Sequence, residues 1–351
     1  MAPQKRTATG ASQPRCLCLE VRAGFGDAPR HMQIAVLNPG GRDREQRFPE
    51  GASAPDARGH APVNYHAYAA CTHGGFFRDV RAIPEDVRAV LLLLRSDLKT
   101  ALAALKALKA QERIVAISWK ESGLHQIAKQ LDSATNLALF REICALADGA
   151  LSSTPELVAL YRAAGARLTE FIPTPYPVDD ARWDCSRPLA ERSGIFIGTR
   201  EWDVPSRNHA AALLRACSLG VPVTVFNLDG RSGRRKLDAL GFGSLRVIES
   251  KLPYADYLRE MAKCRVVFQL DASAVPGQVA GDALLCRMPC IGGNGAVDQV
   301  AFSHGANLES LLRDDVAWRD AVEASQARAR ESLSFAACAA RLRGFFGALA
   351  M

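Results

Sequence analysis

The sequence contains no apolar run of the length that a membrane-spanning helix requires, which is about 20 residues. The apolar segment Val90–Leu94 is ended by Arg95 and instead predicts a buried strand. Residues 1–31 also lack the apolar segment of a secretory signal. They are rich in Pro, Gly, Ala and Arg without periodicity, which predicts a flexible, dispensable extension. We therefore expect a cytoplasmic protein.

The sequence shows neither a disulfide framework nor a metal-binding motif, although it contains ten cysteines. Five of them lie within apolar periodic segments, where a thiol acts as a small hydrophobic side chain: Cys144, Cys217, Cys264, Cys286 and Cys338. Only Cys16 and Cys18 are close enough in sequence to look like a motif, and a lone C-x-C pair does not define a metal site. We expect reduced cysteines and no metal.

The sequence also lacks a stripe of basic residues interleaved with aromatic ones, so we do not expect it to bind nucleic acid. Its formal net charge of +7 is modest for 351 residues. Such an excess suits an anionic ligand such as a nucleotide diphosphate, or peripheral contact with the anionic inner face of a membrane. No G-x-G-x-x-G motif follows the first predicted strand, which argues against a nicotinamide-dependent dehydrogenase.

The sequence does contain a regular alternation of predicted strands and helices. The first strand is Gln33–Leu37, and similar units follow it. Such alternation is typical of a parallel sheet covered by helices on both faces. The segment Pro173–Pro177 has three prolines in five residues, which neither a helix nor a central strand accommodates. The alternation then resumes at Gly194–Ile197.

Two such repeats, separated by a proline-rich break, predict an α/β protein with two Rossmann-like domains facing each other across a cleft. We place the first domain at residues 32–174 and the second at residues 175–330, a division that suits the chain length. Residues 331–351 have helical periodicity with one apolar face, and no strand of the second domain is left for them to cover. We expect this helix to pack on the first domain.

The strand-to-helix loops of the second domain are the first place to look for a ligand. In a doubly wound sheet, ligands bind beyond the carboxyl ends of the strands, near the starts of the following helices. One loop contains Gly198, Arg200 and Arg207, and a helix is predicted to start at Arg207. Guanidinium groups and backbone N–H groups at a helix start suit a diphosphate. The alternative is a solvated loop with ordinary surface arginines.

Asp282 is predicted to lie in the first turn of an otherwise apolar helix. A carboxylate in this position can accept hydrogen bonds from both hydroxyls of a ribose. The alternative is an acid that complements the helix dipole. With Arg200 and Arg207, Asp282 completes a hypothetical nucleotide site.

From about residue 150 to residue 293, the sequence resembles the GT-B glycosyltransferases of family four. The matching features are Val178-Asp179 after the prolines, Gly198, Arg200, Arg207, the turn Asn227–Gly230, Gly277, Asp282 and Pro289. In that family, a glycine and two basic residues hold the donor diphosphate at the positions of Gly198, Arg200 and Arg207. The first domain resembles the family only in its order of strands and helices.

The resemblance implies a glycosyltransferase with a nucleotide sugar as donor and a glycan, a lipid-linked molecule or a small molecule as acceptor. It implies that Asp282 binds the donor ribose, that Gly277 belongs to the donor loop, and that the backbone near Lys251 meets the base. It also implies retention of the anomeric configuration, no metal and no cofactor besides the donor substrate.

Three positions depart from the family pattern. Ala274 stands where a second glutamate usually faces the donor sugar, Asp282 replaces a glutamate, and Arg207 stands where lysine is common. The missing acid keeps a second interpretation open, in which the chain is a non-catalytic nucleotide-sugar binding or scaffold subunit of a polysaccharide assembly complex. A GT-B nucleotide-sugar epimerase is a third interpretation.

The first domain offers candidate residues for catalysis and for the acceptor. His73 precedes two glycines, and its imidazole is a candidate base for the acceptor hydroxyl, or an ordinary loop histidine. Gly40 and Gly41 follow the first strand and allow a close approach of the backbone to a sugar or phosphate, or form a plain turn. His125 starts a helix at the expected edge of the cleft, where a site role and a structural role are both open.

Overall fold

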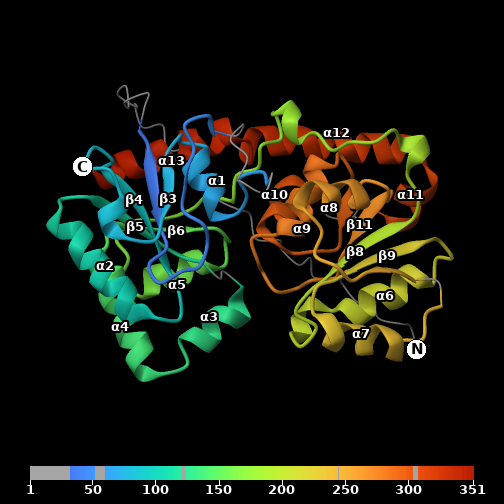
Figure 1. Cartoon of the computed structure of the whole chain (residues 1–351), viewed down its shortest axis with the longest axis horizontal. Helices are drawn as coiled ribbons and strands as arrows, with labels where there is room; N and C mark the ends of the chain where they lie inside the picture. Colours follow the sequence, from blue (N-terminus) through green and yellow to red (C-terminus); the bar gives the residue numbers. More distant parts are fainter. Residues whose placement is uncertain (1–31, 52–59, 121–122, 244, 303–306) are drawn as a thin grey trace, which may run out of the picture. The chain divides into compact units, whose positions relative to one another are not determined.

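The computed structural model describes residues 32–51, 60–120, 123–243, 245–302 and 307–351. The predicted extension over residues 1–31, with its pair of cysteines, lies outside the described residues. The described part of the chain contains two β-sheets, each flanked by helices (Figure 1). Its cysteines are all free. None of its helices combines the length and the apolar character needed to cross a membrane.

The first sheet has seven strands in the order β2-β3-β1-β4-β5-β6-β7. Neighbouring strands are parallel, except that β2 runs antiparallel to β3. Most strands are short apolar runs that are buried on both faces, as is usual in parallel sheets. Their bounds are β1 (Ile34–Leu37), β2 (Gln46–Arg47), β3 (Gly75–Phe77), β4 (Ala89–Leu94), β5 (Ile114–Trp119), β6 (Gly149–Ser152) and β7 (Thr169–Phe171).

The helices of this region alternate with the strands as the sequence predicts. They are α1 (Tyr65–Ala70), α2 (Leu98–Ala110), α3 (Leu124–Gln130), α4 (Ala134–Leu146) and α5 (Leu157–Ala163). Side-chain caps fix two of their starts. Asp97 accepts a hydrogen bond from the backbone N–H of Thr100 at the start of α2, and Ser133 accepts one from Asn136 at the start of α4.

The second sheet has five parallel strands in the order β10-β9-β8-β11-β12. These are the first five strands of the Rossmann order 3-2-1-4-5-6. The strands are β8 (Ile195–Thr199), β9 (Val223–Asn227), β10 (Leu245–Ile248), β11 (Val266–Phe268) and β12 (Cys290–Ile291). The helices are α6 (His209–Cys217), α7 (Gly230–Ala239), α8 (Tyr254–Met261), α9 (Gln278–Leu285), α10 (Ala296–Ala301), α11 (Leu308–Arg313) and α12 (Asp315–Ser332).

The helix α13 (Phe335–Leu349) follows the second sheet in sequence but belongs to the core of the first. Leu342, Phe345 and Phe346 are buried in one cluster with Ile34 of β1 and Tyr68 of α1. Figure 1 shows α13 in red beside the blue strands. We refer to the first sheet with α1–α5 and α13 as the first half, and to the second sheet with α6–α12 as the second half.

The two sheets have no strand in common. β7 ends at Phe171 and β8 begins at Ile195, and the prolines predicted to break the alternation lie between them. In this segment Tyr176 donates its backbone N–H to the carbonyl of Leu333 at 2.8 Å, so the chain leaves the first half and returns to it at adjacent points. The α/β fold with two Rossmann-like halves, predicted from the alternation, is confirmed.

Candidate functional site

The connections of the second sheet change direction between β8 and β11. From β8 the chain adds β9 and β10 on one side, and it then returns to add β11 on the other. The loops that follow β8 and β11 therefore diverge at the carboxyl ends of these strands, which is the usual ligand position in such sheets. Glu201 and Arg207 lie in the first loop, and Asp271 and Ser273 lie in the second. We call this position the switch point.

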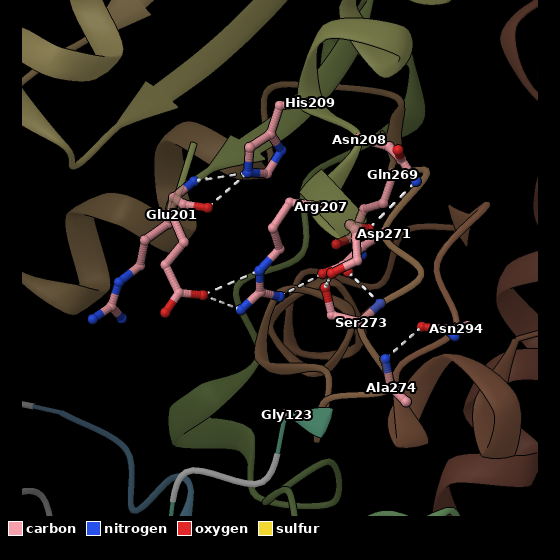
Figure 2. A network of polar contacts seen from close by, with 12 residues as sticks. Gly123, Glu201, Arg207, Asn208, His209, Gln269, Asp271, Ser273, Ala274 and Asn294 are labelled. Atoms are coloured by element: carbon pink, nitrogen blue, oxygen red, sulfur yellow. Dashed lines mark hydrogen bonds and ion pairs between the residues drawn. The ribbon is translucent and has the colours of Figure 1, made fainter. Parts of the chain in front are cut away.

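Arg207 joins the two loops (Figure 2). Its Nε donates to Oε2 of Glu201 at 3.1 Å, and its Nη2 contacts the same oxygen. Its Nη1 donates to Oδ2 of Asp271. The side chains of Arg207 and Asp271 are only 17% and 10% exposed. Separating the partners of a buried ion pair leaves uncompensated charges, which is strongly destabilising. The network therefore holds the two loops together.

The network has one more negative charge than positive charge if all three side chains are ionised. Burial alone would raise the pKa of Glu201, but the hydrogen bond and the positive charge of Arg207, together with the charge of Arg200, lower it. Burial opposes the charge on Arg207 as well, yet Asp271 and Glu201 raise its pKa. Each guanidinium nitrogen already contacts a carboxylate, in three hydrogen bonds out of the five that its N–H groups can donate. A diphosphate would therefore compete with Glu201 and Asp271 for Arg207.

Arg207 precedes a helix but does not start it, which corrects the predicted boundary. It is the last residue of the 3-10 turn Pro205–Arg207, Asn208 adopts a left-handed conformation with φ 51°, and α6 begins at His209. Arg200, in contrast, has an exposed side chain in the same loop. Its backbone is held by Nε2 of His209, which lies 2.7 Å from the Arg200 carbonyl oxygen.

The first half meets the network through the start of α3. The backbone N–H of Leu124 donates to the carbonyl of Ser273 at 3.4 Å, and the amide of Gln126 donates to Oε1 of Glu201 at 3.3 Å. A Cβ atom on Gly123 would lie 3.1 Å from Val275, so glycine allows this close approach. Residues from both halves are thus in contact at the switch point.

His125 lies in the first turn of α3, as predicted, and near Arg207. Its Nδ1 is buried and has no hydrogen-bond partner among the described residues. Burial lowers the pKa of His125, and the positive charge of Arg207 lowers it further, so the ring is uncharged at neutral pH. A buried polar atom without a partner is uncommon and marks a position where a ligand group can bind. The structure therefore brings together two of the predicted site residues.

Asp282 occupies a different position from the one expected. Helix α9 begins at Gln278, so Asp282 lies in its second turn rather than its first. The residue is 1% exposed, and Oδ1 accepts a hydrogen bond from the hydroxyl of Tyr254 at 2.5 Å. Burial raises the pKa of this carboxyl to about 7, against the hydrogen bonds from Tyr254 and Tyr257. A ribose would reach Asp282 only if Tyr254 moved.

The buried carboxyl of Asp282 should make the stability depend on pH. Its pKa rises from 3.8 to about 7 on folding, so the free energy of unfolding should fall as the pH rises through this interval. We expect Asp282→Asn to reduce this slope by at most about 1.4 kcal/mol per pH unit, because the amide oxygen still accepts from Tyr254 but does not ionise. Urea unfolding between about pH 4 and pH 8 measures it. Asp320→Asn, on an exposed face of α12, is the control. Equal slopes in wild type and Asp282→Asn would contradict this role.

Asp298 was not singled out from the sequence, although it shapes the loop that contains Ala274. It lies in α10, is 5% exposed, and burial raises its pKa to about 7. A Cβ atom on Gly277, Gly293 or Gly295 would come within 3.1 Å of a carboxyl oxygen of Asp298. These glycines are therefore required for the close packing around Asp298. The density of glycines at Gly292–Gly295 was the sequence signal for this feature.

The loop after β11 is also bound to the neighbouring glycine-rich turn. Asn294 accepts a hydrogen bond from the backbone N–H of Ala274 at 2.9 Å and donates its own N–H to the carbonyl of Asp271 (Figure 2). Ala274 has φ 48°, which is unusual for a residue with a side chain. The position where an acid was expected is thus held in a fixed backbone conformation.

The other predicted site residues lie apart from this network. His73 precedes β3 at the amino end of the first sheet, opposite the edge where ligands are expected, and its Nδ1 lies 3.0 Å from the carbonyl oxygen of Pro49. This position does not favour its predicted role as a base. Lys251 is exposed in the loop between β10 and α8. Gly198 of β8 lies close to Val279. A Cβ atom on Gly198 would come within 3.1 Å of the side chain of Val279.

Gly40 and Gly41 follow β1, at the carboxyl edge of the first sheet. Gly40 has φ 68°, and a Cβ atom on Gly41 would clash with the side chain of the buried Asn38. Both glycines are therefore required by the turn itself. The described residues include no cluster of His, Cys, Asp and Glu that could hold a metal ion.

Comparison with known proteins shows which fold this is. No protein-family model and no curated protein sequence matches the chain. Among solved structures, it is similar to Anabaena HepE in complex with UDP and glucose, with 15% identity, a TM-score of 0.59, and coverage of 91% of this chain and 100% of that chain. It is also similar to sucrose-phosphate synthase from Thermosynechococcus elongatus, with 15% identity, a TM-score of 0.57, and coverage of 91% and 99%.

A third similar structure is the UDP-forming α,α-trehalose-phosphate synthase of Burkholderia xenovorans, with 10% identity, a TM-score of 0.57, and coverage of 91% and 99%. The likenesses extend over nearly the whole chain, and at these identities they concern the fold. The chain has the GT-B fold of these glycosyltransferases, as the sequence predicts.

Proposed function

We propose that the chain is a glycosyltransferase that uses a uridine diphosphate sugar as donor. The observation that carries this proposal is the switch-point network, in which Arg207 joins the loops after β8 and β11 and His125 approaches from the first half. The similar structures from Anabaena and Burkholderia are described as a UDP complex and a UDP-forming enzyme. A binding position at this edge of the second sheet agrees with the fold.

In the proposed reaction, a hydroxyl oxygen of the acceptor forms a bond with the anomeric carbon of the donor sugar. The bond between that carbon and the diphosphate oxygen breaks, UDP departs with the electron pair, and the acceptor proton passes to a base or to water. The protein must hold the negative charge that develops on the diphosphate. Arg200 is exposed and suited to meet it directly, whereas Arg207 already pairs with two carboxylates that compete with the diphosphate.

His125 is proposed to bind a hydroxyl of the donor sugar. Its ring is uncharged at neutral pH and Nδ1 has no partner among the described residues, so it suits a neutral polar group better than a phosphate. The predicted roles of Asp282 at the ribose and of Lys251 at the base remain part of the proposal. The role of Asp282 requires a rearrangement of Tyr254.

Binding of the donor provides the first test. We expect UDP and UDP-glucose to raise the melting temperature in thermal-shift experiments, because a ligand at 100 times its Kd stabilises the folded state by about 2.7 kcal/mol. Uridine, which lacks the diphosphate, should have a smaller effect. GDP and ADP serve as controls for the base. If no nucleoside diphosphate shifts the transition, the proposed function is wrong.

A non-catalytic role in donor binding is the second candidate, and Ala274 is the observation that favours it. The network around Asn294 fixes the backbone at this position, but no carboxylate is present on the side chain to face the donor sugar. The two candidates differ in the products formed. Release of UDP from UDP-glucose on addition of acceptors indicates transfer, whereas donor binding without any turnover indicates a binding subunit.

A further inference from the structure

A cavity of about 420 Å³ lies in the first half, at the carboxyl end of β1. It is formed by the loop after β1, the start of α1 and Lys120 at the end of β5. The chain also changes direction at this edge of the first sheet, because β3 and β4 lie on opposite sides of β1. The volume is within the usual range for a small-molecule site, and the position is the one at which doubly wound sheets bind ligands.

The charged residues that line this cavity are mostly basic. They include Arg42, Arg44 and Lys120, with Asp43 as the acid. Nζ of Lys120 lies 2.9 Å from Oδ2 of Asp43, which also accepts a hydrogen bond from Asn38 at 2.7 Å. The charges of Lys120 and Asp43 thus compensate each other. Arg42 and Arg44 are exposed, and neither forms an ion pair with a carboxylate of the described residues.

The lining of the cavity extends to the second half. Phe48, Tyr65 and Phe76 contribute to the lining but are almost fully buried, and the ring of His66 stacks on Phe76. On the side of the second half, His60 stacks on Tyr254 with ring centroids 4.7 Å apart. Asn64, also in the lining, donates to the side chain of Gln278, the first residue of α9, at 3.3 Å. A ligand in the cavity would therefore lie beside the second half.

We infer that this cavity binds an acceptor that carries a phosphate monoester, with the guanidinium groups of Arg42 and Arg44 as its ligands. Two guanidinium groups without a carboxylate partner among the described residues match a phosphate monoester, whose charge is about −1.5 to −2 at neutral pH, better than a carboxylate. The monoester belongs either to a soluble sugar phosphate or to a phospholipid. The assignment of this ligand as acceptor rests on the proposed transferase function.

Calorimetry on the full-length protein, saturated with UDP to occupy the donor site, tests the inference. The probes are glucose 6-phosphate and inorganic phosphate, and vesicles containing phosphatidic acid present the same group on a lipid. Glucose and glucuronate show whether the sugar alone or a carboxylate is enough for binding.

We expect Arg42→Ala and Arg44→Ala each to weaken phosphate binding about 10-fold or more, as is typical when a hydrogen bond to a charged group is lost. Arg47→Ala is the matched control, because Arg47 is exposed on β2 outside the cavity lining.

Binding of glucose 6-phosphate or inorganic phosphate that depends on Arg42 and Arg44, but not on Arg47, supports a soluble acceptor. The same dependence with vesicles alone supports a phospholipid acceptor. The inference is overturned if none of the phosphate probes binds, if Arg47→Ala weakens binding equally, or if glucose or glucuronate binds as tightly. A titration of UDP without other ligands reports separately on the proposed function, since these arginines lie outside the switch-point network.

Discussion

Replacing Arg207 with alanine should lower the affinity for UDP by about 10- to 150-fold, the cost of losing one or more hydrogen bonds to a charged group. The change should also reduce the free energy of unfolding by about 3–5 kcal/mol, because Asp271 and Glu201 lose their shared partner. Calorimetry with UDP and urea unfolding measure the two effects. Arg200→Ala should weaken UDP binding without the loss of stability, since its side chain is exposed.

The variant Glu201→Gln distinguishes a phosphate ligand from a purely structural arginine. If UDP binds Arg207 by displacing Glu201, removal of the competing negative charge should raise the affinity for UDP. If Arg207 only joins the two loops, Glu201→Gln should leave the affinity unchanged or lower it. Unchanged UDP affinity in Arg207→Ala would exclude Arg207 from the donor site.

Replacing Phe346 with alanine should destabilise the protein by about 3–5 kcal/mol, the usual cost of removing a large aromatic side chain from a core. Phe346 is fully buried in α13, in the cluster that includes Ile34 and Tyr68 of the first half. The melting temperature and the midpoint of urea unfolding should both fall. This outcome requires that residues far apart in sequence form one cooperative core.

The control for this change is Gly347→Ala in the same helix. A Cβ atom on Gly347 would meet nothing within 4 Å, and alanine favours the helix by about 1 kcal/mol relative to glycine. Gly347→Ala should therefore be neutral or stabilising. If Phe346→Ala unfolds at the same urea concentration as the wild type, α13 does not contribute to the core of the first half.

The alternation of strands and helices was sufficient to predict the two sheets, because parallel strands form short apolar runs that the sequence displays directly. β4 is an example, in which all six residues are buried and the run is ended by a charged residue.

Helix boundaries were predicted less accurately than strands. The sequence placed the start of α9 near Gly281, since Gln278 and Val279 follow a proline and a glycine that are typical of a loop. The left-handed Gly277 instead precedes the helix directly and moves Asp282 into the second turn.

The candidate site was predicted in part. Arg207 and His125 were identified because each follows a strand, and the ends of parallel strands meet at one edge of a sheet. The acidic partners of Arg207 were missed. Asp271 follows β11, which becomes a neighbour of β8 only after two intervening strands are placed on the other side, and no local pattern records this adjacency. For the same reason, the contact between Tyr254 and Asp282 could not be read from the sequence.

The position of α13 has a consequence for synthesis of the chain on the ribosome. The strands of the first sheet are made early, but the helix that covers one of their faces is made only after the whole second half. At about 5–20 residues per second, the residues between β7 and the end of α13 take on the order of 10–40 s to translate. During that time Ile34, Val36 and Phe76 lack their partner Phe346. The nascent first half therefore exposes an apolar surface of the kind that chaperones bind, until translation delivers the helix that covers it.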